Sequence, residues 1–248
     1  MSQKRTLLEV AVFTPESAII ACQAGADRIE LCSGYSEGGL SPSAASIKLV
    51  RQSVDCKLHV MIRPRIGDFL YSEFEKKVIL EDIKFCKASD VNGIVVGVLT
   101  QSGDIDVDFV KTVMETAYPM QVTFHRAFDI SRDLFSSLDV LISCGVNRVL
   151  TSGGKSSAFE GLQTLSEFVK RAANKIIILP GGGINSENVL NILSATKASE
   201  VHFSGKRLVK SKMKPLSEVK LSSTTDTDDH NWFECDFEVV RKMVSKIN

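Results

Sequence analysis

The feature that most constrains the fold of this chain is an alternation of short apolar runs with longer segments at helical spacing, repeated eight times. Unbroken runs such as Ile94-Val95-Val96 and Ile176-Ile177-Ile178 are typical of strands covered on both faces, as strands of a parallel sheet are. The sequence predicts strands at residues 7–13, 28–32, 57–62, 93–98, 121–126, 148–151, 175–179 and 200–203.

Eight strands that each precede a helix predict an α/β fold, the (β/α)8 or TIM barrel, as a single domain over residues 1–248. An open doubly wound sheet is the alternative, although such sheets usually have fewer strands. Helix starts are expected at Thr14-Pro15 and Ser41-Pro42, and Ser72 with Glu75 has the spacing of a capping box.

The segment from about residue 206 to 231 breaks this rhythm, because it is mostly polar. We expect a long loop there between the eighth strand and a last helix at about 237–246. His230, Trp232 and Cys235 lack the spacing of metal ligands and are interpreted as surface and packing residues.

The charge balance and the cysteines of the chain narrow the partners and the location that we expect. Lys plus Arg equals Asp plus Glu, at 30 each, so we expect no nucleic acid and no membrane as partner. The balance favours a small molecule, an ion or a second copy of the chain. A polar start and six scattered cysteines without a C-x-x-C pair favour a cytoplasmic protein with reduced thiols.

In such barrels the functional site lies where the strands end, so polar residues late in strands are the candidates. Glu9 and Glu30 lie within apolar strands, and a buried carboxylate needs a cation, a metal or several donors. Arg63 and Arg126, at the ends of the third and fifth strands, are possible partners. The alternative is that these charges form a structural ion-pair network inside the barrel.

Strand alternation groups the candidates, because side chains two apart share a face. Glu30 and Cys32 share one face of the second strand. His59, Met61 and Arg63 share one face of the third strand. In the fifth strand either Thr123 and His125 or Phe124 and Arg126 face inward, and the sequence leaves both open. His125 is either a residue of the barrel mouth or a core histidine, and Asp129 follows in the loop that leaves the mouth.

The turn Gly181-Gly182-Gly183 precedes a helix and resembles a phosphate cradle, which Ser204 after the eighth strand would complete. Glu187 in the first turn of that helix opposes an anion, and the glycines are alternatively needed only for turn geometry.

Cys32 is the candidate ligand for a soft metal, because Cu(I) prefers sulfur. Met61 or His59 is the possible second ligand, and the alternative is an inert buried thiol.

The chain resembles the CutC copper homeostasis family in strings that span nearly its whole length. These strings are Gly25-Ala26-Asp27-Arg28-Ile29-Glu30-Leu31-Cys32, Glu37-Gly38-Gly39-Leu40-Ser41-Pro42, Met61-Ile62-Arg63-Pro64-Arg65, Val122-Thr123-Phe124-His125-Arg126-Ala127-Phe128-Asp129, Arg148-Val149-Leu150-Thr151-Ser152-Gly153 and the turn from Pro180 to Ile184.

The resemblance implies a cytoplasmic TIM barrel, often a homo-oligomer, that serves copper homeostasis and in some members binds Cu(I). The ligands proposed in that family are cysteines at the ends of the first two strands. The second corresponds to Cys32, whereas Ala11 stands at the first position.

Two hypotheses follow. In the first, the protein binds copper as Cu(I) through Cys32. In the second, it is an enzyme that acts on a small anionic, possibly phosphorylated, metabolite. There, Arg63, Arg126, Ser204 and the glycine turn would hold the anion, and Glu9, Glu30, His125 or Asp129 would handle protons.

Overall fold

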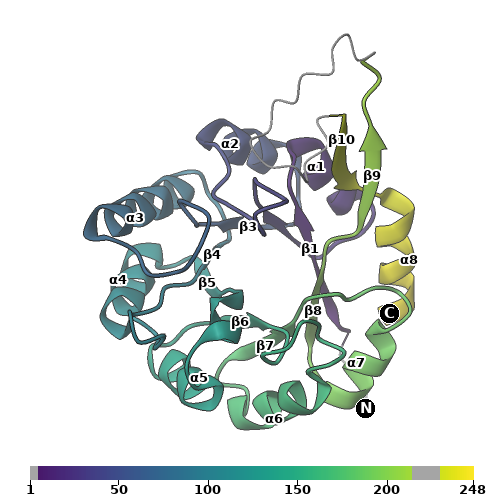
Figure 1. Cartoon of the computed structure of the whole chain (residues 1–248). Coiled ribbons are helices and arrows are strands. Elements are labelled where there is room, and N and C mark those ends of the chain that lie inside the picture. The colour runs from purple at the N-terminus through teal and green to yellow at the C-terminus, as the bar shows by residue number, and fades with distance from the viewer. Residues whose placement is uncertain (1–4, 214–229) are drawn as a thin grey trace.

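The structure is a computed structural model that describes residues 5–213 and 230–248 of the 248-residue chain. Parallel strands form a nearly closed barrel (Figure 1), with neighbours in the order β7-β6-β5-β4-β3-β2-β1-β8 and β7 lying beside β8. The strands are β1 (Leu7–Val12), β2 (Arg28–Leu31), β3 (Lys57–Met61), β4 (Gly93–Val96), β5 (Gln121–Phe124), β6 (Arg148–Thr151), β7 (Ile177–Pro180) and β8 (Glu200–Phe203).

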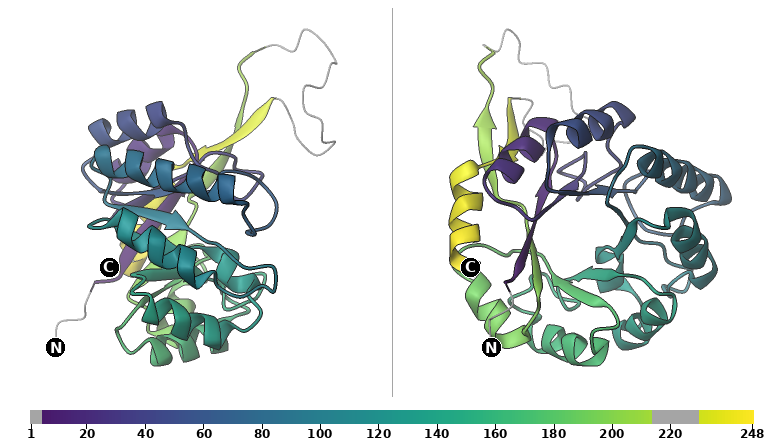
Figure 2. Two further views of the ribbon diagram at one scale, coloured as in Figure 1. Left: turned by 90° about the vertical axis from the view of Figure 1, so that its left-hand side faces the viewer. Right: turned by 180° about the vertical axis from the view of Figure 1, so that it is seen from behind.

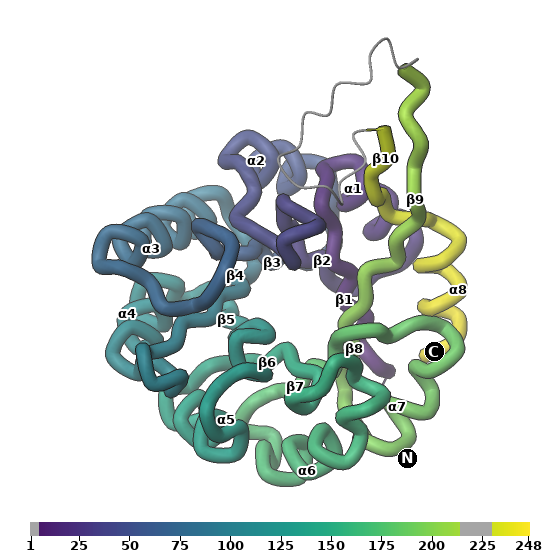
Figure 3. Tube along the Cα trace, viewed as in Figure 1, coloured from purple at the N-terminus to yellow at the C-terminus, as the bar shows by residue number. Residues whose placement is uncertain are grey.

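Helices surround the barrel, one after each strand (Figure 3), so the predicted TIM barrel is confirmed and the open sheet is wrong. A short 3-10 helix, η1 (Arg126–Ile130), follows β5. Within residues 5–213 and 230–248, no helix has the length and apolar character needed to cross a membrane. The helices are α1 (Pro15–Gln23), α2 (Ala44–Ser53), α3 (Glu73–Ala88), α4 (Val107–Ala117), α5 (Leu134–Ser143), α6 (Leu162–Ala172), α7 (Val189–Thr196) and α8 (Phe237–Ile247).

Two of the predicted helix starts are confirmed: Thr14 caps α1, and Ser72 with Glu75 forms a capping box on α3. The start predicted at Ser41-Pro42 is wrong, because Ser43 caps α2 by accepting a hydrogen bond from Ser46 N–H at 3.1 Å. Ser41 instead accepts a hydrogen bond from the backbone N–H of Arg63 at 3.0 Å. A tertiary contact at the end of β3 therefore uses the hydroxyl that the sequence assigned to the helix.

The 206–231 connection, predicted as a loop, has two strands at its ends, and residues 214–229 lie outside the described part of the chain. β9 (Lys206–Lys210) pairs antiparallel with β10 (Asn231–Cys235), and this hairpin extends away from the barrel (Figure 2). Its base is tied down at Cys235, which is buried and whose N–H donates to the Ser17 hydroxyl at 3.0 Å.

The two faces of the barrel sheet bury different kinds of side chain. Outward-facing residues such as Leu8 and Ile29 are fully buried and apolar, and they pack beneath the helices. The alternate, inward-facing positions of the same strands carry Glu9, Arg28 and Glu30, which are also buried. Branched apolar residues usually fill the interior of such a barrel, so a charged interior marks the site.

Candidate functional site

A cavity of about 420 Å³ opens at the carboxyl ends of the strands. It brings together seven of the residues that the sequence singled out, and they come from four different strands or the segments that follow them. These seven are Glu30, Cys32, Met61, Arg63, His125, Arg126 and Ser204. The rest of the wall is mainly apolar and consists of Ala11, Phe13, Tyr35, Ser36, Gly38, Phe69, Leu150 and His202.

Glu30 and Cys32 lie side by side on the wall, as strand alternation predicted. Burial raises the pKa of Glu30 to about 7, with His202 acting against this shift and the charge of Glu9 adding to it. Burial, and then the charge of Glu30, raises the pKa of the Cys32 thiol well above its ordinary value. The thiol is therefore protonated at neutral pH and donates a hydrogen bond to the Glu30 carboxylate.

The His202 ring lies between Glu30 and a second carboxylate, that of Glu9, which is deeper in the barrel. Its Nδ1 lies 2.8 Å from Glu9 Oε1, and its Nε2 lies 3.8 Å from Glu30 Oε2. Burial lowers the pKa of His202, but the hydrogen bond to Glu9 and the charge of Glu30 outweigh this and raise it. Glu9 stays ionised, because Arg28 and His202 outweigh its burial and hold its pKa well below the usual range. Glu9 therefore orients His202 from below.

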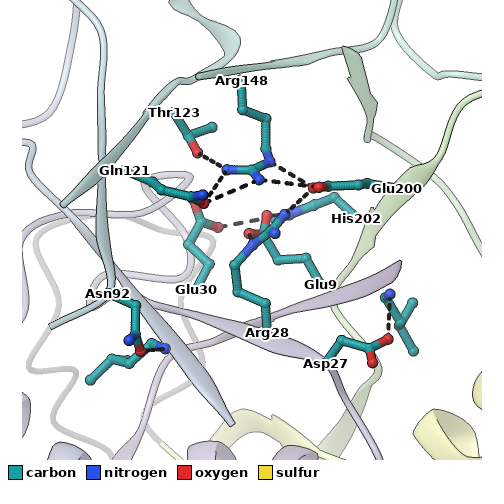
Figure 4. Close-up of polar contacts among 12 residues, drawn as sticks. Glu9, Asp27, Arg28, Glu30, Asn92, Gln121, Thr123, Arg148, Glu200 and His202 are labelled. Carbon is teal, nitrogen blue, oxygen red and sulfur yellow. Dashed lines mark hydrogen bonds and ion pairs between the residues drawn. The ribbon is translucent and has the colours of Figure 1, made fainter. Parts of the chain in front are cut away.

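Beneath this pair the barrel interior holds a buried ion-pair network (Figure 4). Arg28 contacts Glu9 and also donates to Glu200 at 2.6 Å, and Arg148 donates to the same carboxylate at 2.6 and 3.1 Å. Thr123 accepts from Arg148 at 3.3 Å. Glu9 therefore belongs to a structural ion-pair network inside the barrel, which was one of the two alternatives for the buried carboxylates. Glu30, in contrast, faces the cavity.

Arg63 crosses from the end of β3 to the loops around the mouth. Its guanidinium donates to three backbone carbonyls: Glu37 at 2.7 Å, Gly39 at 3.1 Å and Gly67 at 2.9 Å. It also lies over the ring of Phe69, 5.0 Å from the centroid. Within the described residues no carboxylate forms an ion pair with Arg63, so its charge is not neutralised by an acidic side chain.

The structure decides which face of β5 points inward: Thr123 contacts the internal network, and His125 lines the cavity. His125 Nδ1 accepts a hydrogen bond from Ala127 N–H at 3.1 Å. Burial, and then the nearby charge of Arg63, lowers the pKa of His125 to about 3, so its ring is neutral. Gly97 makes room for this ring, because a Cβ there would lie 2.3 Å from His125 Cε1.

Arg126 and Asp129 form a separate cluster at the rim. Arg126 lines the cavity, but its charge is paired with Asp129 at 2.8 Å. Asp129 also accepts from Thr151, Ser152 and Gly154, so the chain itself uses its oxygens.

Gly182 of the triple-glycine turn lies against Arg126. A Cβ on Gly182 would lie 3.5 Å from the Arg126 guanidinium, and the three glycines are not among the cavity-lining residues. The Asn185 side chain accepts from the N–H groups of Glu187 and Asn188, at 2.8 and 3.2 Å. Two N–H groups just before α7, which a bound phosphate could otherwise use, are therefore bonded within the chain.

Two sulfur-containing side chains, Cys32 and Met61, lie close together on the cavity wall. A Cβ added to Gly39 would lie 3.4 Å from both Cys32 Sγ and Met61 Cε, and both side chains pack with Val95 and Phe13. His59 lies deeper and does not line the cavity; burial, and then Arg28, lowers its pKa well below the usual range. Among the residues that the structure describes, no group of three or more His, Cys, Asp or Glu side chains is arranged to hold a metal ion. Thiolate and thioether sulfur nevertheless fit Cu(I).

The sequence reasoning missed His202 and the network residues Arg28, Arg148 and Glu200. The signal was present in β8, where Glu200, His202 and Ser204 alternate with apolar residues. Period-two polar residues in a strand covered on both faces indicate a polar barrel interior. It also missed the aromatic part of the wall, because Tyr35 and Phe69 come from loops.

Comparisons with known proteins agree with this picture. The model of the CutC family matches residues 6–207. The human copper homeostasis protein cutC homolog is 42% identical over 238 residues, which cover 96% of this chain and 87% of the human protein. A family protein CutC from Parabacteroides distasonis is 40% identical over 242 residues, covering 97% of this chain and 100% of that protein.

Solved structures support the same assignment. The crystal structure of CutC from Streptococcus agalactiae matches with a TM-score of 0.76 at 29% identity, covering 79% of this chain and 97% of that one. A structure called QR15, an aldolase, matches with a TM-score of 0.63 at 12% identity, over 82% of this chain and 91% of that one, which shows the fold alone. From the family match and the extent of these identities, we conclude that the chain belongs to the CutC family.

Proposed function

We propose that the cavity at the barrel mouth binds a small anionic molecule and carries acid–base chemistry on it. The observation that carries this proposal is the guanidinium of Arg63, which lines the cavity and, among the described residues, forms no ion pair with a carboxylate. An anion beside such a charge gains a charge-assisted hydrogen bond in a largely apolar cavity.

The groups for proton transfer lie on the same wall. Glu30, with a pKa of about 7, exchanges its proton near neutral pH, where general acids and bases work best. His202, held by Glu9, is the neighbouring proton donor at 3.8 Å from Glu30. This arrangement supports proton transfer carried out by side chains alone.

Thermal unfolding in the presence of inorganic phosphate, sulfate or acetate tests the anion site. A ligand of the folded state raises the apparent stability, by about 2.7 kcal/mol at a concentration 100 times its Kd. We expect an upward shift in Tm for the wild type and no shift for Arg63→Gln. Arg132→Gln, which alters an exposed arginine paired with Asp104, is the matched control and should keep the shift. An equal shift in the Arg63→Gln protein would refute the assignment.

Binding of Cu(I) as cargo is the second candidate function, in the cytoplasm, where thiols stay reduced. The packing of Cys32 and Met61 in one cluster favours it, and relatives carry copper homeostasis in their names. The raised pKa of Cys32 opposes it, because the metal must displace the thiol proton. Glu30, hydrogen-bonded to that thiol, is placed to accept the proton.

Anaerobic titration with Cu(I) against a competing chelator tests this site. We expect about one Cu(I) per chain, loss of binding in Cys32→Ser, weaker binding in Met61→Leu, and tighter binding at higher pH. Cys144→Ser, which changes a half-buried cysteine at the end of α5, is the control. Unchanged stoichiometry in Cys32→Ser would rule out the ligand. Light scattering on the same samples tests the homo-oligomer that the family resemblance implies.

A further inference from the structure

Three buried polar atoms of cavity-lining residues have no hydrogen-bond partner within the described chain. They are Glu30 Oε1, His125 Nε2 and Arg63 Nε. Buried polar groups in folded proteins are nearly always paired, so three such atoms around one cavity indicate groups that a ligand satisfies. The side chains are between 3% and 8% exposed, which excludes free hydration as a general explanation.

The three atoms differ in whether they donate or accept a hydrogen bond. Arg63 Nε is a donor only. His125 Nδ1 accepts from Ala127 N–H, so the neutral ring carries its proton on Nε2, which is therefore also a donor. Glu30 Oε1 accepts when the carboxyl is ionised and can donate when it is protonated.

The two donors are grouped at one ring. The centroid of Phe69 lies 5.0 Å from the Arg63 guanidinium carbon and 4.9 Å from the centroid of the His125 ring. Glu30 stands instead with Cys32 and His202, on β2 and β8. The cavity therefore offers one cationic donor and one neutral donor at one place, and a carboxyl beside an imidazole at another.

We infer that the ligand is a small hydroxylated anion, whose anionic group is bound by Arg63 and His125 and whose hydroxyl is bound by Glu30 beside His202. This inference rests on the proposed function and adds the ligand class. A hydroxyl both donates and accepts, so it satisfies Glu30 in either protonation state. Phe13, Tyr35 and Leu150 offer apolar contacts for the carbon skeleton, and about 420 Å³ is within the range of small-metabolite sites.

Calorimetric titration with matched ligand pairs tests the inference. One pair is glycerol 3-phosphate and propyl phosphate; the other is lactate and propionate, so the pairs also separate phosphate from carboxylate. Because a hydrogen bond to a charged group contributes about 1.5–3 kcal/mol, we expect the hydroxylated member of at least one pair to bind about tenfold or more tightly. Glu30→Ala should bring the two members to equal affinity, and Glu167→Ala, on the exposed face of α6, should preserve the difference.

The outcomes separate the two proposals. Equal affinities within both pairs for the wild type overturn the hydroxyl inference but leave the anion site standing. Absence of binding by all four probes overturns both. In the wild type the preference for the hydroxyl should grow as Glu30 ionises, because a hydrogen bond to a charged group is the stronger one. Should Glu30→Ala fail to fold, Glu30→Gln keeps the shape and an acceptor oxygen, so it should retain a preference for the hydroxyl that no longer varies with pH. A preference that still varies with pH in Glu30→Gln would contradict the role of Glu30.

Discussion

At the scale of single residues, Glu30 titrates near neutral pH and makes the site respond to pH there. Burial raises its pKa from 4.5 to about 7 in the folded protein, so the folded state holds this proton more tightly than the unfolded chain. Its stabilising contribution is complete below pH 4.5 and is lost as the pH rises to about 7. We expect the stability of Glu30→Gln to gain about 3 kcal/mol relative to the wild type between pH 4.5 and about pH 8. Urea unfolding at the two pH values measures this, and a constant difference between the proteins would contradict it.

At the scale of secondary-structure elements, the ammonium group of Lys206 is one of the contacts between the β9–β10 hairpin and the cavity wall. Lys206 Nζ lies 4.5 Å from the ring centroid of Tyr35 and 4.7 Å from that of Phe233. Since such a contact contributes about 0.5–2 kcal/mol, we expect Lys206→Ala to speed amide hydrogen exchange in both hairpin strands by about tenfold. Lys210→Ala, at an exposed position of β9, should leave exchange at the hairpin base unchanged. Equal rates in the two variants would show that the hairpin is held by other contacts.

At the scale of the whole molecule, Arg28 joins strands that are far apart in sequence. It binds Glu9 on β1 and Glu200 on β8, and Glu200 binds Arg148 on β6. Removing one partner of a buried ion pair leaves a charge unpaired, so Arg28→Met should lower the free energy of unfolding by about 3–5 kcal/mol. Arg5→Met, which removes an arginine that is 59% exposed and paired with Asp27, should cost less than about 1 kcal/mol. Similar losses in urea unfolding would mean that the network does not stabilise the barrel.

Much of the fold could be read from the sequence, because hydrophobic period and helix capping are local. Each barrel strand lies within two residues of its predicted bounds at either end. The sharing of one face by Glu30 and Cys32 also followed from strand alternation alone. The β9–β10 hairpin was missed, and its contacts with Tyr35 and Ser17 join it to residues that lie far away along the chain.

The sequence by itself determined the barrel and which residues lie where its strands end, since both follow from spacing along the chain. Only the tertiary structure decided the inward face of β5 and the ionisation of Glu9 and Glu30. These depend on partners such as Arg28 and Glu200, which are 172 positions apart. Burial and charge act through space, so the chemistry of the mouth is set by neighbours that no local pattern brings together.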